Sequence, residues 1–503
     1  MWNIDWSKIG EELSYNPDSP MIFNSGVFLF LFLGFSIIYW KLRKADTLRL
    51  IFVLLFSYYF YYKSSGIYFI ILALVTISDY YIAKAIELDR ENNRDLGQDK
   101  HTWTQRFLLF FSLVIDLGFL CFFKYTNFFG ELAASFSGGQ FRPLDIFLPV
   151  GISFFTFQSL SYTIDVYRGQ LKALNSLLDY AFFVSFFPQL VAGPIVRAKD
   201  FIPQIRRPLC VTDEMFGNGV FFIISGLFKK AVISDYISVN FVERVFAQPE
   251  LYSGFENLMA VYGYALQIYC DFSGYSDMAI GIALLLGFKF PMNFDSPYKS
   301  VSITEFWRRW HISLSSWLKD YLYISLGGNR HGKIRQYLNL IITMLLGGLW
   351  HGASLNFVAW GGLHGVALAL DKIKNTLLKR PKNYKSHGMT RVIETVITFH
   401  FVCFCWIFFR NSTFEGSWAM ISQIFTNFSP QIAGEWVTSY WAVGSLMLLG
   451  YLLHFTPSSW TGKFKWLVSR TPLPIQALMI VIVIFIVIQI KSSDIQPFIY
   501  FQF

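Results

Sequence analysis

Long apolar runs recur along the whole chain and constrain its fold more than any other feature. They occupy residues 27–39, 48–62, 67–83, 107–123, 258–288, 338–350 and 475–490. A helix needs roughly 20 mostly apolar residues to cross a bilayer, and several of these runs approach that length. Only 15% of the residues are charged, whereas soluble domains average about 25%. The sequence therefore predicts an all-α, polytopic membrane protein that has membrane lipid as a partner.

The formal net charge of +9 comes from basic residues that lie between the apolar runs. They cluster at residues 41–44, 197–207 and 308–335, and in a basic loop at 372–391. Loops rich in Lys and Arg stay on the cytoplasmic side of a membrane. We therefore expect these four clusters in the cytoplasm and the acidic segment 1–20 outside. The positive charge thus marks the cytoplasmic loops, and we expect no nucleic-acid partner.

The organisation that we predict is a single membrane domain over residues 1–503, because no polar stretch is long enough for a soluble domain. Counting apolar blocks gives about 10–13 transmembrane and re-entrant helices. Residues 182–195 and 216–228 are expected to be short buried or re-entrant helices. The start of the chain lacks the basic region and apolar core of a cleavable signal peptide. The five cysteines lack the paired spacing of a zinc site, so we expect no bound metal.

Two aspartates interrupt the apolar run at residues 258–288. Asp271 and Asp277 lie in the stretch Tyr-Cys-Asp-Phe-Ser-Gly-Tyr-Ser-Asp, which also holds Tyr275. An Asp at the centre of a membrane helix costs about 2.5 to 3.5 kcal/mol, so both face protein, water or cations. At six residues apart they point in directions about 240° apart, unless glycine breaks the helix at residues 273–274. Pinning neighbouring helices and lining a substrate path are both open as their role.

The next segment combines indole, guanidinium and imidazole groups. Its candidate substrate- or donor-binding residues are Trp307, Arg308, Arg309, Trp310, Asp320, Tyr321, Asn329 and Arg330. A membrane interface, where Trp, Tyr and Arg gather, explains most of them but leaves His311 unexplained. The glycines at 327–332 resemble a phosphate loop, but residue 334 is Ile and no α/β unit surrounds them. We reject a nucleotidase and retain only the possibility of a phosphorylated donor held at Arg330.

Two further histidines are flanked by glycine. Trp350 and His351 lie in Gly-Gly-Leu-Trp-His-Gly, and His364 lies in Trp-Gly-Gly-Leu-His-Gly. Glycine lets a substrate or another helix approach closely, and helix packing alone also explains it. A neutral imidazole, with an ordinary pKa of about 6.5, is a natural general base for activating a hydroxyl. The sequence holds no metalloprotease, serine-hydrolase or dinucleotide motif, so the histidines are the candidate catalytic residues.

At these residues the sequence resembles the membrane-bound O-acyltransferase family, most closely its bacterial branch like the alginate O-acetyltransferase. The resemblance covers nearly the whole chain and lies in residues 187–197 (Phe-Pro-Gln-Leu-Val-Ala-Gly-Pro-Ile-Val-Arg), 269–277, 306–311 (Phe-Trp-Arg-Arg-Trp-His), 320–324, 327–330, 349–352 and 498–503 (Phe-Ile-Tyr-Phe-Gln-Phe). It implies a ring of helices around a tunnel between the two sides of the membrane. It also implies that His351 and His311 are the catalytic residues.

Three functions are compatible with these features. The resemblance implies transfer of an acetyl group from a cytoplasmic donor, acetyl-CoA, for O-acetylation of an extracellular or cell-wall polysaccharide. It implies a location in the bacterial cytoplasmic membrane, a periplasmic or extracellular acyltransferase partner, and no bound cofactor. Transfer of D-alanine from a carrier protein to teichoic acid is the second function, and a non-enzymatic transporter is the third. We expect the aromatic motif 498–503 either to dock in the outer tunnel mouth or to lie in an interfacial aromatic belt.

Overall fold

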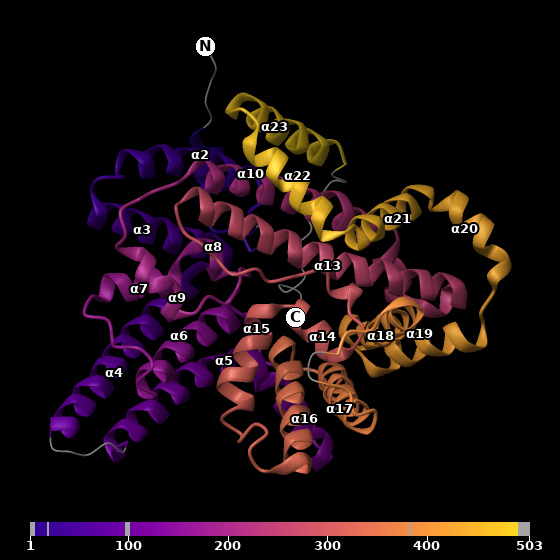
Figure 1. The fold of residues 1–503 in the computed structure, drawn as a ribbon, viewed down its shortest axis with the longest axis horizontal. Coiled ribbons are helices and arrows are strands. Elements are labelled where there is room, and N and C mark those ends of the chain that lie inside the picture. Colours follow the sequence, from indigo (N-terminus) through magenta and orange to yellow (C-terminus); the bar gives the residue numbers. More distant parts are fainter. Residues whose placement is uncertain (1–5, 18–19, 96–100, 382–383, 491–503) are drawn as a thin grey trace. The chain divides into compact units, whose positions relative to one another are not determined.

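The structure is a computed structural model that describes residues 6–17, 20–95, 101–381 and 384–490. Every regular element in the described residues is a helix, which confirms the predicted all-α class. The chain divides into two compact units (Figure 1). The first unit comprises residues 1–215 and 282–291, and the second comprises residues 216–281 and 292–503. The single-domain organisation and the role of the motif at 498–503, which lies outside the described residues, stay predictions.

The first unit is built from the N-terminal helices, which pack against sequence neighbours and against helices further along the chain. They are α1 (Trp6–Leu13), α2 (Gly26–Lys41), α3 (Asp46–Ser65), η1 (Gly66–Tyr68), α4 (Phe69–Asp95), α5 (Trp103–Ser137), α6 (Ile152–Tyr167), α7 (Leu177–Ser185), α8 (Phe187–Leu190) and α9 (Ala198–Ile205).

Phenylalanine rings form the core of the first unit. Phe187, at the start of the four-residue helix α8, is fully buried. Its ring lies 5.0 Å from that of Phe56 and 5.6 Å from that of Phe35. Such aromatic contacts stabilise a core beyond the area that they bury. The segment 182–195 therefore consists of short buried helices, as its length predicted.

The second unit holds the remaining helices. They are α10 (Asp213–Leu227), η2 (Phe228–Ser234), α11 (Asp235–Ile237), η3 (Ser238–Val242), α12 (Glu243–Ala247), η4 (Pro249–Leu251), α13 (Gly254–Leu285), η5 (Pro297–Lys299), α14 (Ile303–Arg309), α15 (Ile312–Trp317), η6 (Leu318–Tyr323), α16 (Gly332–His351), α17 (Leu355–Leu377), α18 (Gly388–Arg410), α19 (Phe414–Thr426), η7 (Pro430–Ile432), α20 (Ala433–Ser439), α21 (Trp441–Phe455), α22 (Ser458–Arg470) and α23 (Leu473–Ile490). The first residues of α10 and the last turn of α13 belong to the first unit.

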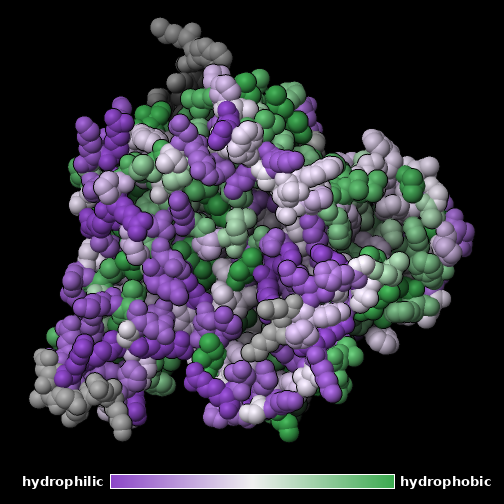
Figure 2. Space-filling model, viewed as in Figure 1, coloured by the Kyte–Doolittle hydropathy of each residue, from purple (hydrophilic) through white to green (hydrophobic). Residues whose placement is uncertain are grey.

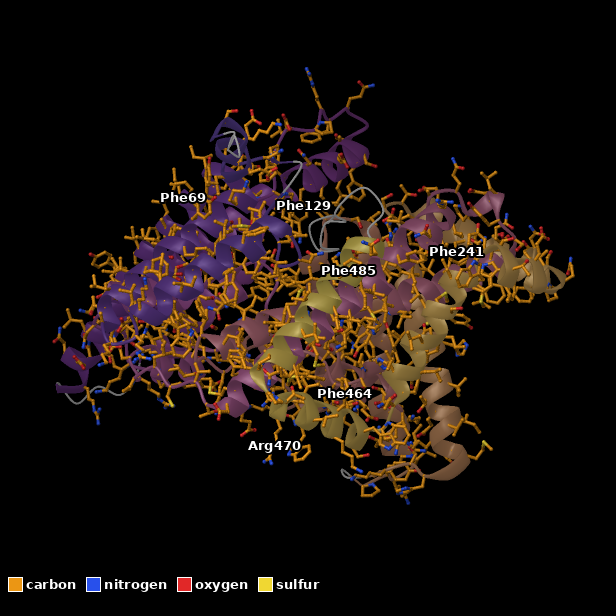
Figure 3. All side chains as sticks on the ribbon, turned by 90° about the horizontal axis from the view of Figure 1, so that it is seen from above. Phe69, Phe129, Phe241, Phe464, Arg470 and Phe485 are labelled. Carbon is orange, nitrogen blue, oxygen red and sulfur yellow. The ribbon has the colours of Figure 1, made fainter. Side chains whose placement is uncertain are left out.

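Three helical segments among the described residues are long and apolar enough to cross a membrane. They are Asp46–Arg94, Trp103–Ser137 and Gly388–Arg410, and two bent pairs, Pro430–Phe455 and Ser458–Val487, raise the count to five if each is one span. Phe464 and Phe485, labelled in Figure 3, are 56% and 60% exposed, and hydrophobic residues also gather over α19 and α20 in Figure 2. Lipid covers such surfaces in a membrane protein. The chain is a multi-pass membrane protein, whereas the 10–13 helices and the tunnel stay predictions.

Glycines hold α16 and α17 together as a tight hairpin. Ser354 caps α17 by accepting a hydrogen bond from the backbone N–H of Phe357. A Cβ on Gly361 would lie 2.3 Å from the carbonyl oxygen of Met344, and one on Gly348 would lie 2.2 Å from that of Phe357. Only glycine permits backbones this close. Helix packing, one of the two explanations of these glycines from the sequence, is therefore confirmed for Gly348 and Gly361.

Candidate active site

His351 is the last residue of α16 and lies in an aromatic enclosure. Its side chain is buried, and its ring lies 4.9 Å from Trp350, 5.0 Å from Trp360 and 5.2 Å from Phe409. These rings come from α16, α17 and α18, so three helices position the imidazole. These apolar surroundings exclude water, so a general base at this position would take a proton from the bound acceptor and not from solvent.

His311 lies in the turn between α14 and α15, outside the segments long enough to cross a bilayer. Its backbone is left-handed, with φ 42°, a conformation that His tolerates better than most residues. The ring is fully buried, 4.6 Å from Phe272 of α13 and 6.0 Å from Trp350. Burial lowers the pKa of His311 to about 3, so the imidazole is neutral at physiological pH.

Trp350 joins the two candidate catalytic histidines. Its indole contacts the ring of His311 on one side and that of His351 on the other. The two residues are 40 positions apart in the sequence, yet the structure brings them to one buried indole. These are the two predicted catalytic histidines, and Trp350 is a predicted binding residue that contacts both.

The predicted binding residues Trp307 and Trp310 are buried in protein, so the membrane-interface interpretation is wrong for them. The indole N–H of Trp307 donates a hydrogen bond to Nδ1 of His364 over 3.3 Å. Trp310 is 1% exposed and packs 4.9 Å from the ring of Trp406. Both indoles pack among other large buried rings: Trp307 lies 5.7 Å from Trp360 of α17, and Trp310 lies 5.6 Å from Phe306 of α14.

Asp271 and Asp277 each pair with a lysine. Lys230 Nζ lies 2.6 Å from Asp271 and 2.8 Å from Asp235, and Lys229 Nζ lies 2.7 Å from Asp277. The helix α13 is continuous, so the predicted break at residues 273–274 is wrong. A Cβ on Gly274 would lie 2.8 Å from the carbonyl oxygen of Gly226, and the glycine serves this close helix approach.

Adjacent lysines reach two aspartates that lie six residues apart on α13. Neighbouring side chains of a helix point about 100° apart, and the long lysine side chains span the remaining distance. Lys229 and Lys230 lie at the start of the π-helix η2 and point to different turns of α13. Each buried carboxylate is thereby neutralised, as burial of charge requires. The geometry establishes the pinning of helices, and a substrate-path role stays a prediction.

The other predicted binding residues spread over the second unit. Tyr275 is buried on α13 and Tyr321 is buried on η6, while Asp320 is half-buried. Arg309 is tied to Glu305 and Asp295 by ion pairs. Arg308, Asn329 and Arg330 are exposed, the last two in the turn before α16.

The sequence analysis did not single out Lys229 and Lys230, and it did not name His364 among the catalytic or binding residues. Lys229 and Lys230 follow directly on an apolar block, and that position, beside two costly aspartates, was the available signal. His364 is fully buried and lies 4.9 Å from Trp360, which also contacts His351. Its glycine-flanked motif, like that of His351, was the signal for it.

The fold and this site define a helical, multi-pass membrane protein with catalytic-type histidines buried among aromatic rings. The profile of the membrane-bound O-acyltransferase family matches residues 167–413. A probable alginate O-acetylase of Pseudomonas aeruginosa is 41% identical over 81% of this chain and 75% of its own length. A peptidoglycan O-acetyltransferase of Helicobacter pylori is 36% identical over 79% and 78%, and a teichoic acid D-alanyltransferase of Bacillus subtilis is 30% identical over 53% and 69%.

The chain belongs to the membrane-bound O-acyltransferase family and is an acyltransferase. Family membership thus decides against the non-enzymatic transporter as its function.

Proposed function

We propose that this chain moves an acetyl group from acetyl-CoA, on the cytoplasmic side of a bacterial inner membrane, for O-acetylation of an extracellular or cell-wall polysaccharide. The observation that carries the proposal is the meeting of His311 and His351 at Trp350. The relatives named as O-acetylases and O-acetyltransferases of polysaccharides match about four fifths of the chain.

In the proposed reaction His351 is the general base. Its imidazole takes the proton of the acceptor hydroxyl as the hydroxyl oxygen attacks the thioester carbonyl carbon. The C–S bond then breaks, and the leaving thiolate takes the proton back from the imidazolium. The acceptor is the polymer hydroxyl itself or a hydroxyl of an extracellular partner acyltransferase that passes the group on.

His311 is proposed to hold the thioester. A neutral imidazole carries one N–H, which donates to the carbonyl oxygen and stabilises the oxyanion as negative charge develops. The exposed Arg330 in the turn before α16 and the exposed Lys333 and Arg335 in the first turn of α16 attract the phosphates of the donor.

D-alanyl transfer from a carrier protein is the second candidate function. It is favoured by the teichoic acid D-alanyltransferase relative, which however matches only 53% of this chain. The two functions differ in donor: a coenzyme thioester against a protein-bound thioester.

The test is to incubate the purified full-length protein with acetyl-CoA labelled in the acetyl group. We expect release of free coenzyme A and label on polysaccharide or on an added extracellular partner. An arm with D-alanine loaded on a carrier protein is the comparison. Turnover of the D-alanyl carrier without turnover of acetyl-CoA would overturn the acetyl proposal in favour of the second function.

A further inference from the structure

The first unit contains a pair of buried carboxyl groups that the acyl-transfer site does not use. Asp79 lies on α4 and Asp116 on α5, and both are 0% exposed. The Asp116 carboxyl group lies against that of Asp79, because Ser112, one turn before Asp116 on α5, is hydrogen-bonded to Asp79. Phe129, further along α5 and labelled in Figure 3, is 54% exposed, so α5 turns one apolar face outward while Asp116 points inward.

Hydroxyl donors converge on Asp79 alone. Ser112 of α5 donates to its Oδ1 over 2.7 Å, and Ser159 of α6 donates to its Oδ2. Ser159 spends its only proton on Asp79, so Tyr180 of α7 must donate in the 2.8 Å contact between the two hydroxyls. These donors stabilise the ionised form of Asp79, which accepts their hydrogen bonds. The network joins four helices, α4, α5, α6 and α7.

Asp116 has no donor of this kind. Neither of its carboxyl oxygens accepts a hydrogen bond from any described residue. Two adjacent carboxylates repel each other strongly when buried, and an unpaired buried charge is costly. A proton on Asp116 solves both problems, because the protonated group donates to Asp79.

No cation in the described part of the chain takes that role. No Lys, Arg or His forms an ion pair with either carboxyl group, in contrast to Asp271 and Asp277. Lys84 on α4 is exposed over the ring of Tyr80, and Lys124 is eight residues beyond Asp116, about 12 Å along the axis of α5. The titratable groups facing the pair are the phenols of Tyr162 and Tyr180, and Glu87 and Tyr80 lie beside Tyr162.

We propose that Asp79 and Asp116 form a proton-binding site in which one proton, carried on Asp116, is shared between the two carboxyl groups and locks α4, α5 and α6 together. Release of this proton leaves two negative charges side by side, and their repulsion weakens the contact between α4 and α5. The site makes the stability of the first unit depend on pH, independently of the acyl donor and of the histidine site.

Infrared spectroscopy of the full-length protein in lipid nanodiscs tests the proton directly. We expect a protonated carboxylic-acid carbonyl band at neutral pH that shifts on exchange into D₂O. The band disappears in Asp116→Asn and Asp116→Ser, which keep a donor for Asp79, and persists in Asp213→Asn, which removes an exposed carboxylate at the start of α10. A wild-type spectrum without any such band overturns the proposal, whether or not the variants fold.

Thermal unfolding against pH is the second measurement. The folded pair holds a proton that the unfolded chain releases at neutral pH, so the stability from the pair falls as pH rises. We expect the unfolding midpoint of wild type and Asp213→Asn to drop toward alkaline pH, and that of Asp116→Asn to drop clearly less. Equal pH dependence in all three overturns the proposal. A midpoint that rises with NaCl but not with KCl at alkaline pH also overturns it, in favour of a sodium site.

Discussion

The proposed acyl transfer depends on where the backbone places the imidazoles of His311 and His351. His351 ends a helix and His311 occupies a left-handed turn, so neither ring is held by the regular interior of a long helix. Each is fixed by aromatic rings from other helices. Rigid aromatic contacts keep an imidazole oriented at small entropic cost, and orientation is what proton transfer requires.

Replacing the proposed base is the first test at the residue scale. His351→Ala is expected to lower acetyl transfer by about 10² to 10⁴ fold, the usual loss on removing a general base. The variant should still reach the membrane as folded protein. The matched control is His400→Ala, since His400 is exposed on α18. Its two hydrogen bonds, with the Tyr262 hydroxyl and the Val396 carbonyl oxygen, are solvent-exposed. Normal transfer by His351→Ala, measured with labelled acetyl-CoA, would remove the assignment.

The role of His311 is separable from its backbone strain. Ala and Gln pay similar costs at φ 42°, so a comparison of His311→Ala with His311→Gln isolates the side-chain chemistry. If His311 donates a hydrogen bond to the thioester carbonyl, the Gln amide N–H restores much of the rate that Ala loses. Equal loss in both variants, measured as kcat at saturating donor, would show that the imidazole is needed for proton transfer instead.

At the scale of elements, the helix contacts of α13 and the glycine hairpin determine which side chains meet. The sequence predicted that Asp271 and Asp277 needed partners, because their desolvation cost is readable from the apolar run around them. It did not predict the partners, because the contact between α13 and the segment of Lys229 and Lys230 is a tertiary contact. The helix break that glycine left open at residues 273–274 is absent, since a glycine serves a close helix contact equally well.

Two adjacent glycines of α17 allow a controlled test of the hairpin. A Cβ on Gly361 would meet the carbonyl oxygen of Met344 at 2.3 Å, whereas one on Gly362 would meet Leu345 Cδ2 at an ordinary 3.5 Å. Gly361→Ala is therefore expected to destabilise the protein by about 1–3 kcal/mol through overpacking. Gly362→Ala should be neutral or slightly stabilising, because alanine favours the helix. The measurement is thermal unfolding in detergent, and an equal midpoint for both variants would contradict the close packing.

Breaking the lysine pairs should cost more than the glycine change. Lys230→Met leaves Asp271 and Asp235 without their shared cation, and removal of one member of a buried pair typically costs about 3–5 kcal/mol. Adding Asp271→Asn to that variant should recover part of the loss, because one uncompensated carboxylate disappears. A double variant no more stable than Lys230→Met would mean that Asp271 is not held by this lysine.

At the scale of the whole molecule, the assignment as a membrane protein followed directly from composition, since apolar runs of this length are typical of membrane-spanning helices. The pairing of His311 with His351 at Trp350 could not follow from composition, because it depends on tertiary contacts between α14, α16 and α13. The family motifs supplied it. The interface interpretation of Trp307 and Trp310 was wrong because it too depended on tertiary contacts. The sequence cannot distinguish a Trp in a protein core from a Trp at the lipid headgroups.

Membrane orientation is the property that the basic clusters predict and that a native cysteine can report. Cys210 is exposed in the segment between α9 and α10, next to the exposed Arg206 and Arg207, which the positive-inside rule places in the cytoplasm. A membrane-impermeant maleimide should therefore label Cys210 in opened cells and leave it unlabelled in intact ones. Cys121 is the other exposed cysteine among the described residues, but it lies in the middle of the apolar helix α5, where a water-soluble reagent does not reach it.

Two variants make the labelling quantitative. Cys210→Ser should remove the signal of opened cells, which assigns it to this thiol. In that background Asp145→Cys, exposed between α5 and α6, should label in intact cells. Gly66, with φ 59°, divides the long segment Asp46–Arg94 into α3 and α4, each long enough to cross the bilayer. With α5 this makes three crossings between the basic cluster at residues 41–44 and Asp145. Labelling of Cys210 from outside intact cells would reverse the topology. The acyl donor would then have to reach the histidines from the opposite side, and a cytoplasmic coenzyme thioester could not serve as donor.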